Sequence, residues 1–441
     1  MKKFAMLCAV SALSLMLATT AANAAGEDGD LTLQDAVAKG IVTNPDFGMI
    51  EADRDATKEE HSQAKALYLP SIDLLGESGW ERTNRPGIDK ENKWRNRASL
   101  TLTQMLFDGF AARSEVARQK YRVESTVNRT AEIAEFIGLD IVEAYLEVLR
   151  QRDLLAIARA NVDDHTRILD TIQTGASAGT VTEGDVQQAL ARTAQARATV
   201  SSIEQDLREA EALFIQKAGD MPGDMAFPEI PRDKLSPDVD EAVRVAVTNS
   251  PTLNVFESDI KVAQEEYNAA GSTLYPQIDL VANAQAGHDL DGIDGHEDGQ
   301  SVLAVLNWNL YRGGADYARQ REFMYRHAKA KETRAVAARQ VEKDMRDTWA
   351  GMQAAQARAQ QFLEQATANE KVVGVYLDQF SLDRRTLLDV LDSQNELFVS
   401  RSSHVNSLYT EMFAVFRVLA LQGRLLNTLN VPKPPMVVRA N

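Results

Sequence analysis

Residues 376–394 read YLDQFSLDRRTLLDVLDSQ, and this stretch interrupts one long amphipathic helix and begins another. The polar run from Ser381 to Arg385 predicts a turn between the two helices. Asp389 and Asp392 follow this turn, and because they are three residues apart they share a face of the second helix. The sequence therefore predicts a helical hairpin whose returning arm begins with two carboxylates on one side.

A weaker copy of this bend lies at residues 175–186, which read GASAGTVTEGDV. Its Thr182 and Asp185 fall where Thr386 and Asp389 fall, at a constant offset. Two bends of the same design in one chain predict two helical hairpins related by duplication.

The duplication extends well beyond the bends. Residues 70–74 read PSIDL and residues 276–280 read PQIDL, and Tyr145 of the first half corresponds to Trp349 of the second. A repeat with this many parts indicates one unit used twice: helix, strand, loop, strand, long helix, bend and helix. We expect a signal peptide at 1–24, a first repeat at 25–218, a Pro/Gly linker at 219–238, a second repeat at 239–430 and a tail at 431–441.

The long helices are expected to form rods. From residue 111 to about residue 174 the chain has no proline, and Gly138 is its only glycine. A helix rises 1.5 Å per residue, so this segment is roughly 90–100 Å long. Helices of that length indicate coiled-coil or tube packing, with a plain periplasmic coiled-coil spacer as the alternative.

Each half also contains two segments with a two-residue alternation of apolar and polar side chains. In the first half these segments are 71–80 and 98–104, and they flank a polar, net basic stretch, 82–97, which we expect to be a loop. Such alternation predicts β-strands. The chain should therefore contain four strands.

The last of these strands has the side pattern of a membrane barrel. Leu306, Trp308 and Leu310 fall on one side, and Asn307 and Asn309 fall on the other. This is the lipid-out, water-in alternation of such a barrel. Because four strands cannot close a barrel and an open edge cannot lie in hydrocarbon, several chains must contribute strands. The alternative is a soluble four-stranded sheet packed on helices.

Other features narrow the class of protein. Lys2 and Lys3 precede an apolar run and an A-x-A cleavage site, as in a secretory leader, and the only cysteine, Cys8, lies inside it. A net charge of −16 argues against nucleic acid as a partner. The six histidines are scattered, and the chain has no HExxH, phosphate-binding glycine loop or G-x-S-x-G. We expect neither an enzyme nor a metal or cofactor site.

The stretch 289–299, DLDGIDGHEDG, is the one acidic loop with a resemblance to a calcium-binding loop. It lacks the full twelve-residue ligand spacing, so we expect a solvated acidic loop that faces the cell exterior, with cation binding left open. Attraction to the basic stretch 82–97 of a neighbouring subunit is a hypothesis for a lid.

The chain resembles the TolC family of outer-membrane efflux and secretion ducts, which includes type I secretion members. The motifs that carry the resemblance are Asn44-Pro45, 102–109 (LTQMLFDG), 310–314 (LYRGG) and 385–392 (RTLLDVLD). The resemblance implies a mainly α protein with a membrane β-barrel. The expected assembly is a homotrimer with a twelve-stranded outer-membrane barrel, continued by a periplasmic α-helical barrel. A periplasmic adaptor and an inner-membrane transporter are the implied partners, besides outer-membrane lipid.

The resemblance also implies a pore constriction at the periplasmic tip. In the family, paired aspartates form a cation-binding ring there, and Asp389 and Asp392 match them. The positions that match the family's gate latch are Arg385, Asp185, Phe380 and Gly184. Phe380 stands where the family has a tyrosine, so it lacks the hydroxyl group. Six carboxylates from three chains around a narrow axis would repel one another and favour a bound cation. The alternative is that the aspartates serve only the helix N-terminus.

Three functions remain after these observations. The chain is an exit duct for type I secretion of a large adhesin or toxin, an exit duct for small-molecule efflux, or a passive spacer. Strands inserted at matching places in both halves disfavour the spacer. The pattern is closer to secretion-type members, while the substrate itself depends on the transporter.

Overall fold

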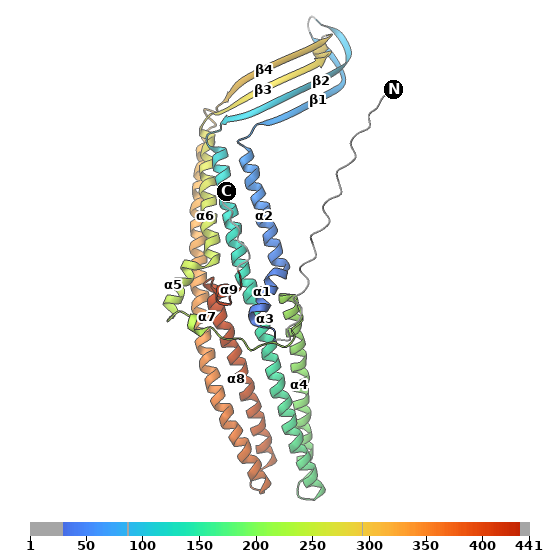
Figure 1. Ribbon diagram of the computed structural model, residues 1–441, viewed down its shortest axis with the longest axis vertical. Helices are drawn as coiled ribbons and strands as arrows, with labels where there is room; N and C mark the ends of the chain where they lie inside the picture. The colour runs from blue at the N-terminus through green and yellow to red at the C-terminus, as the bar shows by residue number, and fades with distance from the viewer. Residues whose placement is uncertain (1–29, 86–87, 293, 433–441) are drawn as a thin grey trace, which may run out of the picture.

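The computed structural model describes residues 30–85, 88–292 and 294–432. The molecule is elongated, with a four-stranded sheet at one end and long helical hairpins that reach the other end (Figure 1). Its helices are α1 (Leu33–Thr43), α2 (Pro45–Ala66), α3 (Ala111–Ser177), α4 (Glu183–Ala218), α5 (Val239–Asn249), α6 (Pro251–Ala270), α7 (Ala315–Ser381), α8 (Leu387–Leu421) and α9 (Leu425–Thr428). Its strands are β1 (Ser71–Arg85), β2 (Ile88–Phe107), β3 (Gln277–His288) and β4 (His296–Asn307).

The sheet is antiparallel throughout, in the order β1-β2-β3-β4. Its two faces differ in polarity, as the alternation predicts. One row across the strands consists of Ile72, Leu102, Ala282 and Val302. The next row, on the opposite face, consists of Asp73, Thr101, Asn283 and Ser301. The sheet thus has a more apolar and a more polar face, which is the pattern expected of a membrane barrel strand.

The prediction of a polar loop at 82–97 is wrong. β1 continues to Arg85 and β2 already begins at Ile88, so nearly all of this stretch is paired strand. The reason is cross-strand pairing, which stabilises a sheet even where the residues are polar. Trp80 lies opposite Trp94, and the Arg95 guanidinium pairs with Glu77 at 2.7 Å and with Glu81 at 3.1 Å.

The last strand is shorter than the sequence pattern indicates. β4 ends at Asn307, so Trp308 and Leu310 lie outside it. The Trp308 indole donates to the backbone carbonyl of Leu274 at 3.4 Å. This contact holds the segment after β4 against the segment before β3. The chain then turns into α7 through Gly313 and Gly314, both in the left-handed region.

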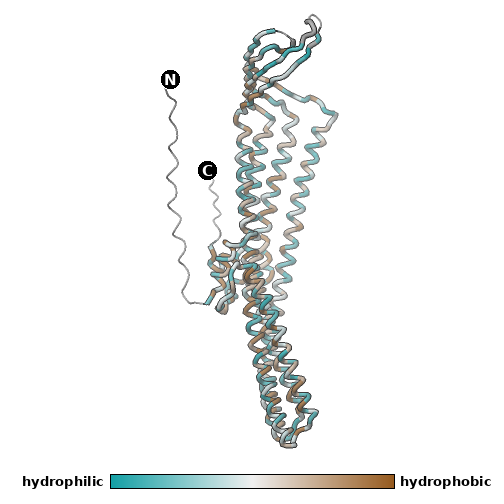
Figure 2. Tube along the Cα trace, turned by 90° about the vertical axis from the view of Figure 1, so that its right-hand side faces the viewer, coloured by the Kyte–Doolittle hydropathy of each residue, from teal (hydrophilic) through white to brown (hydrophobic). Residues whose placement is uncertain are grey.

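The long helices are confirmed. α3 and α7 each span 67 residues, about 100 Å at the standard rise. α4 and α8 return beside them, and polar and apolar residues alternate in patches along all four (Figure 2). The same series of elements, from short helix to returning helix, occurs twice along the chain. Within the described residues, no helix is both long enough and apolar enough to cross a membrane.

The largest apolar cluster lies where α1, α3, α4, α8 and α9 meet, midway along the molecule (Figure 1). Tyr145 is fully buried in it, and its hydroxyl lies 2.6 Å from the carbonyl of Leu31 and 2.7 Å from that of Ala226. Burial raises the pKa of this phenol to about 12. Tyr145 thus ties both the N-terminal segment and the linker to the rods. The expected signal peptide lies outside the described residues.

Candidate functional site

The two helical bends lie together at the end of the molecule opposite the sheet (Figure 1). Beneath them is a small apolar cluster that joins both hairpins. It consists of Ile168, Leu169, Ile172, Val186, Ala189, Leu387, Val390 and Leu391. The residues of the cluster belong to α3, α4 and α8. Burial of their apolar surface therefore holds the two bends in a fixed relative position. All of the predicted gate residues are on this tip.

Both returning helices begin with the same capping box. The Thr182 hydroxyl donates to Asp185 at 2.7 Å, and the Thr386 hydroxyl donates to Asp389 at 2.8 Å. In each case the backbone N–H of the aspartate donates back to the threonine oxygen. These contacts satisfy backbone donors that a helix start leaves open. The helix-terminus role is therefore present for Asp389, whose carboxylate accepts the hydrogen bonds from the Thr386 hydroxyl and backbone N–H through one oxygen, Oδ2.

Asp392 lies one turn further along α8 and has a partner on the other hairpin. Its Oδ1 accepts a hydrogen bond from Arg192 Nη2 of α4 at 2.9 Å. The Asp392 side chain is 54% exposed and that of Arg192 31% exposed. Sequence reasoning missed Arg192, because periodicity within one helix does not identify a partner on another.

Arg385 is held by residues of its own hairpin. Its Nε donates to Gln379 at 3.2 Å, and its guanidinium carbon lies 4.0 Å from the centre of the Tyr376 ring. Its Nη1 is 3.8 Å from Asp389 Oδ2. Among the described residues of one chain, Arg385 and Asp185 form no ion pair, so a latch between them stays a prediction.

The aromatic partner of Arg385 is Tyr376 and not Phe380. Both rings pack against the tip cluster, and Phe380 lines a groove of about 190 Å³ there together with Ile168 of α3 and Val390 of α8. Tyr376 precedes Phe380 by four residues, and this spacing places both on one helix face. That spacing is the sequence signal which could have identified Tyr376.

Gly184 lies in the first turn of α4 and is not required by packing. A Cβ atom there would meet only Thr182 Oγ1, at an ordinary 3.5 Å.

His165 of α3, in the same hairpin, is buried, and burial lowers the pKa of its imidazole. The Thr193 hydroxyl of α4 donates to the His165 carbonyl at 3.4 Å, which joins the two arms of the first hairpin.

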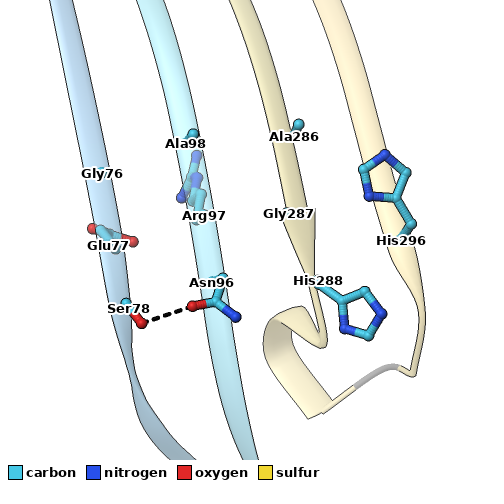
Figure 3. Close-up of a pocket in the computed structure, with 10 residues that line it drawn as sticks. All are labelled: Gly76, Glu77, Ser78, Asn96, Arg97, Ala98, Ala286, Gly287, His288 and His296. Carbon is cyan, nitrogen blue, oxygen red and sulfur yellow. Dashed lines mark hydrogen bonds between the residues drawn. The ribbon is translucent and has the colours of Figure 1, made fainter. Parts of the chain in front are cut away.

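The far end of the sheet contains an open hollow of about 410 Å³ (Figure 3). The expected acidic loop at 289–299 is only partly a loop, because β4 begins at His296 and residues 296–299 pair with β3. His288 and His296 lie opposite each other on β3 and β4, and the Ser78 hydroxyl donates to Asn96 at 2.7 Å. Lys93 of β2 pairs with Asp294 of the loop, so the basic and acidic stretches meet within one chain. In the part of the chain that the structure describes, no three His, Cys, Asp or Glu side chains are grouped to hold a metal ion.

Comparison with known proteins identifies the family of most of the chain. The family described as "Outer membrane efflux protein" matches residues 37–219 and 242–418. The chain is 25% identical over 395 residues to outer membrane efflux protein BepC of Brucella suis biovar 1 (strain 1330), covering 89% of this chain and 86% of that protein. It is 24% identical over 403 residues to outer membrane protein TolC of Escherichia coli (strain K12), covering 87% and 80%.

Solved structures show the same fold. The outer-membrane channel OprN superposes with a TM-score of 0.79 at 16% sequence identity, over 89% of this chain and 90% of that one. The expected combination of helical rods with barrel strands is therefore confirmed. Because the family match covers most of the sequence, this chain belongs to the outer membrane efflux protein family, whose members are outer-membrane channels with a periplasmic helical extension.

Proposed function

We propose that this protein works as a homotrimer that forms the exit duct of a tripartite export system. The observation that carries the proposal is the four-stranded sheet, in which β1 and β4 pair on one side only within the described chain. A membrane barrel needs about eight strands or more, and unpaired backbone groups in lipid cost several kcal/mol each. Three copies joined β4 to β1 supply twelve strands and leave no free edge.

The duct requires partners that supply energy and specificity. We propose a periplasmic adaptor around the helical rods and an inner-membrane transporter below the tip. The relatives include outer-membrane proteins named as parts of efflux pumps, which supports this arrangement. The apolar face of the sheet contacts outer-membrane lipid, and the net charge of −16 disfavours nucleic acid.

The tip acts as the constriction in this proposal. Asp389 and Asp392 share one face of α8, and their side chains are 40% and 54% exposed. Three copies around one axis would bring these six carboxylates into a ring that attracts cations. Arg385, Asp185, Phe380 and Gly184 surround the bends and are the proposed gate latch. Open space at Gly184 leaves room for a neighbouring chain.

We propose small molecules as the substrates. The names of several relatives refer to solvent, toluene or pyoverdine, and these support small-molecule efflux over secretion of an adhesin or toxin. The test is deletion of the gene, followed by growth with organic solvents and dyes and by analysis of the secreted proteins. Increased susceptibility with unchanged secretion supports the proposal. Loss of one large secreted protein at unchanged susceptibility overturns it in favour of type I secretion.

A further inference from the structure

The tip of each chain carries two guanidinium groups for its two proposed ring carboxylates. Arg385 lies 3.8 Å from Asp389, and Arg192 lies 2.9 Å from Asp392. In each chain, these two aspartates and two arginines together have a formal charge of zero. A trimeric ring built from these side chains therefore does not carry the full negative charge of six bare aspartates.

The two pairs differ in strength. Asp389 directs Oδ2 to the capping hydrogen bonds, and its distance to Arg385 exceeds hydrogen-bond length. Asp392 accepts a charge-assisted hydrogen bond directly from Arg192. Arg385 is also held by Gln379 and by the Tyr376 ring, so its charge is shared among several partners. Arg192 is thus the cation that acts most directly on a ring carboxylate.

We propose that Arg192 determines the cation affinity of the constriction by neutralising Asp392. This inference rests on the proposed function, since it assumes that Asp389 and Asp392 line the pore. Attraction between a permeating cation and the ring depends on the net charge at short range. One guanidinium per chain beside Asp392 removes three negative charges from the field of the trimer. Arg192 is therefore a specificity-determining residue for ion passage.

The effect concerns the electric field and not the stability of the tip. Both side chains are partly exposed, at 31% and 54%, and a pair in contact with water contributes little to folding. The apolar cluster beneath the bends holds the hairpins together without it. Because Arg192 is on α4 and Asp392 on α8, the neutralisation lasts only while the two hairpins stay together. Separation of the hairpins exposes an unpaired Asp392 and makes the open pore more attractive to cations.

The test is single-channel recording of the full-length protein in planar lipid bilayers, with hexaamminecobalt(III) as the blocking cation on the periplasmic side. Arg192→Gln should bind the blocker about tenfold more tightly than the unmodified protein, since a unit charge is removed from each chain close to a trivalent ion. Arg192→Met should behave in the same way. Arg192→Lys keeps the charge and should stay near the unmodified value.

Arg197→Gln is the matched control. Arg197 lies on the same helix, five residues further from the bend, and is exposed, so its removal changes the charge equally at a greater distance from Asp392. It should leave the block unchanged. If Arg192→Gln and Arg192→Met both bind the blocker within about twofold of Arg197→Gln, the inference is overturned, because no local charge effect of that size would exist.

Two further variants separate this inference from the function on which it rests. Asp389→Asn and Asp392→Asn should each weaken the block if the aspartates line the pore. If neither variant changes the block, the proposed constriction is wrong. If both weaken it while the Arg192 variants do nothing, the constriction stands and the role of Arg192 alone is refuted.

Discussion

The guanidinium of Arg385 lies over the ring of Tyr376, with its carbon atom 4.0 Å from the ring centre. Phe380, four residues later in α7, packs against the apolar tip cluster, as Tyr376 also does, but in the described part of the chain it has no contact of this kind with Arg385. An aromatic face attracts a cation whether or not the ring has a hydroxyl group. The position of Arg385 within its hairpin is therefore maintained by Tyr376, although Phe380 lacks a hydrogen-bonding group.

Substitution of Tyr376 should loosen the tip. A cation–π contact at an exposed site contributes about 0.5–1 kcal/mol, so Tyr376→Leu should raise the probability of the open state about two- to fivefold. Tyr376→Phe keeps the ring and is the control. The measurement is the open probability in planar bilayers. Equal effects of the Leu and Phe variants would show that the ring does not hold Arg385.

Charge reversal at the proposed latch should open the tip more than substitution of Tyr376 does. Arg385→Glu places a negative charge next to Asp389, and Asp185→Arg places a positive charge at the first bend. Both should loosen the tip, the first through like-charge repulsion within the second bend and the second through loss of the capping box of α4. Single-channel conductance should rise in each variant. Unchanged conductance and unchanged cation block in both would contradict the assignment of these residues to the gate.

The two turns that join a strand to a long helix each contain a glycine, and the effects of substituting these two glycines on protein stability can be compared. Gly109 (φ +68°) and Gly313 (φ +63°) both adopt the left-handed region. A side chain costs about 1–2 kcal/mol in that conformation at either position. At Gly109 a Cβ would also lie 2.5 Å from the carbonyl oxygen of Ser272, whereas at Gly313 it would meet nothing within 4 Å.

We therefore expect Gly109→Ala to lower the Tm and the yield of assembled protein more than Gly313→Ala does. The comparison cancels the shared backbone cost and isolates the contact with Ser272. Thermal unfolding in detergent, followed by circular dichroism, measures it. Equal losses in the two variants would mean that the segment before β3 does not lie against the end of β2.

The first hairpin should lose stability in mild acid. Burial lowers the pKa of His165, with the nearby Arg192 adding to the effect and Asp164 opposing it. The folded state therefore disfavours the protonated imidazole, while the unfolded chain takes up a proton near its ordinary pKa of about 6.5. Stability attributable to His165 is thus complete above that pH and decreases as the pH falls below it.

The measurement is the pH dependence of Tm between about pH 8 and pH 5. His165→Gln stays neutral throughout and should flatten the decline. The pKa of His327 on α7 is also lowered by burial, but this side chain is more exposed than that of His165, so His327→Gln should flatten the decline less. A pH profile that His165→Gln leaves unaltered would exclude this imidazole as the cause.

The sequence allowed the rods and bends to be predicted closely. Residues 111–174 lack proline and have one glycine, and helix α3 covers them fully. The bend at Ser381 to Arg385 lies between α7 and α8 as expected. These features depend on local periodicity and capping, which are written in consecutive residues.

Features that depend on contacts between distant segments could not be predicted in this way. The stretch 82–97 is polar enough for a loop, yet Arg95 and Glu77 pair across two strands. Arg192 and Asp392 are 200 residues apart and meet only because the apolar tip cluster joins their hairpins. The predicted repeat boundaries and the roles of Asp389 and Asp392 in a ring stay predictions.

The central claim is that three chains form a pore whose narrowest point is lined by Asp389 and Asp392. The most direct test is single-channel recording of the unmodified protein and of the double variant Asp389→Asn/Asp392→Asn. The account predicts small, cation-selective conductance that hexaamminecobalt(III) blocks, and loss of that block in the double variant with the pore still conducting. A double variant that is blocked as strongly as the unmodified protein would contradict the claim.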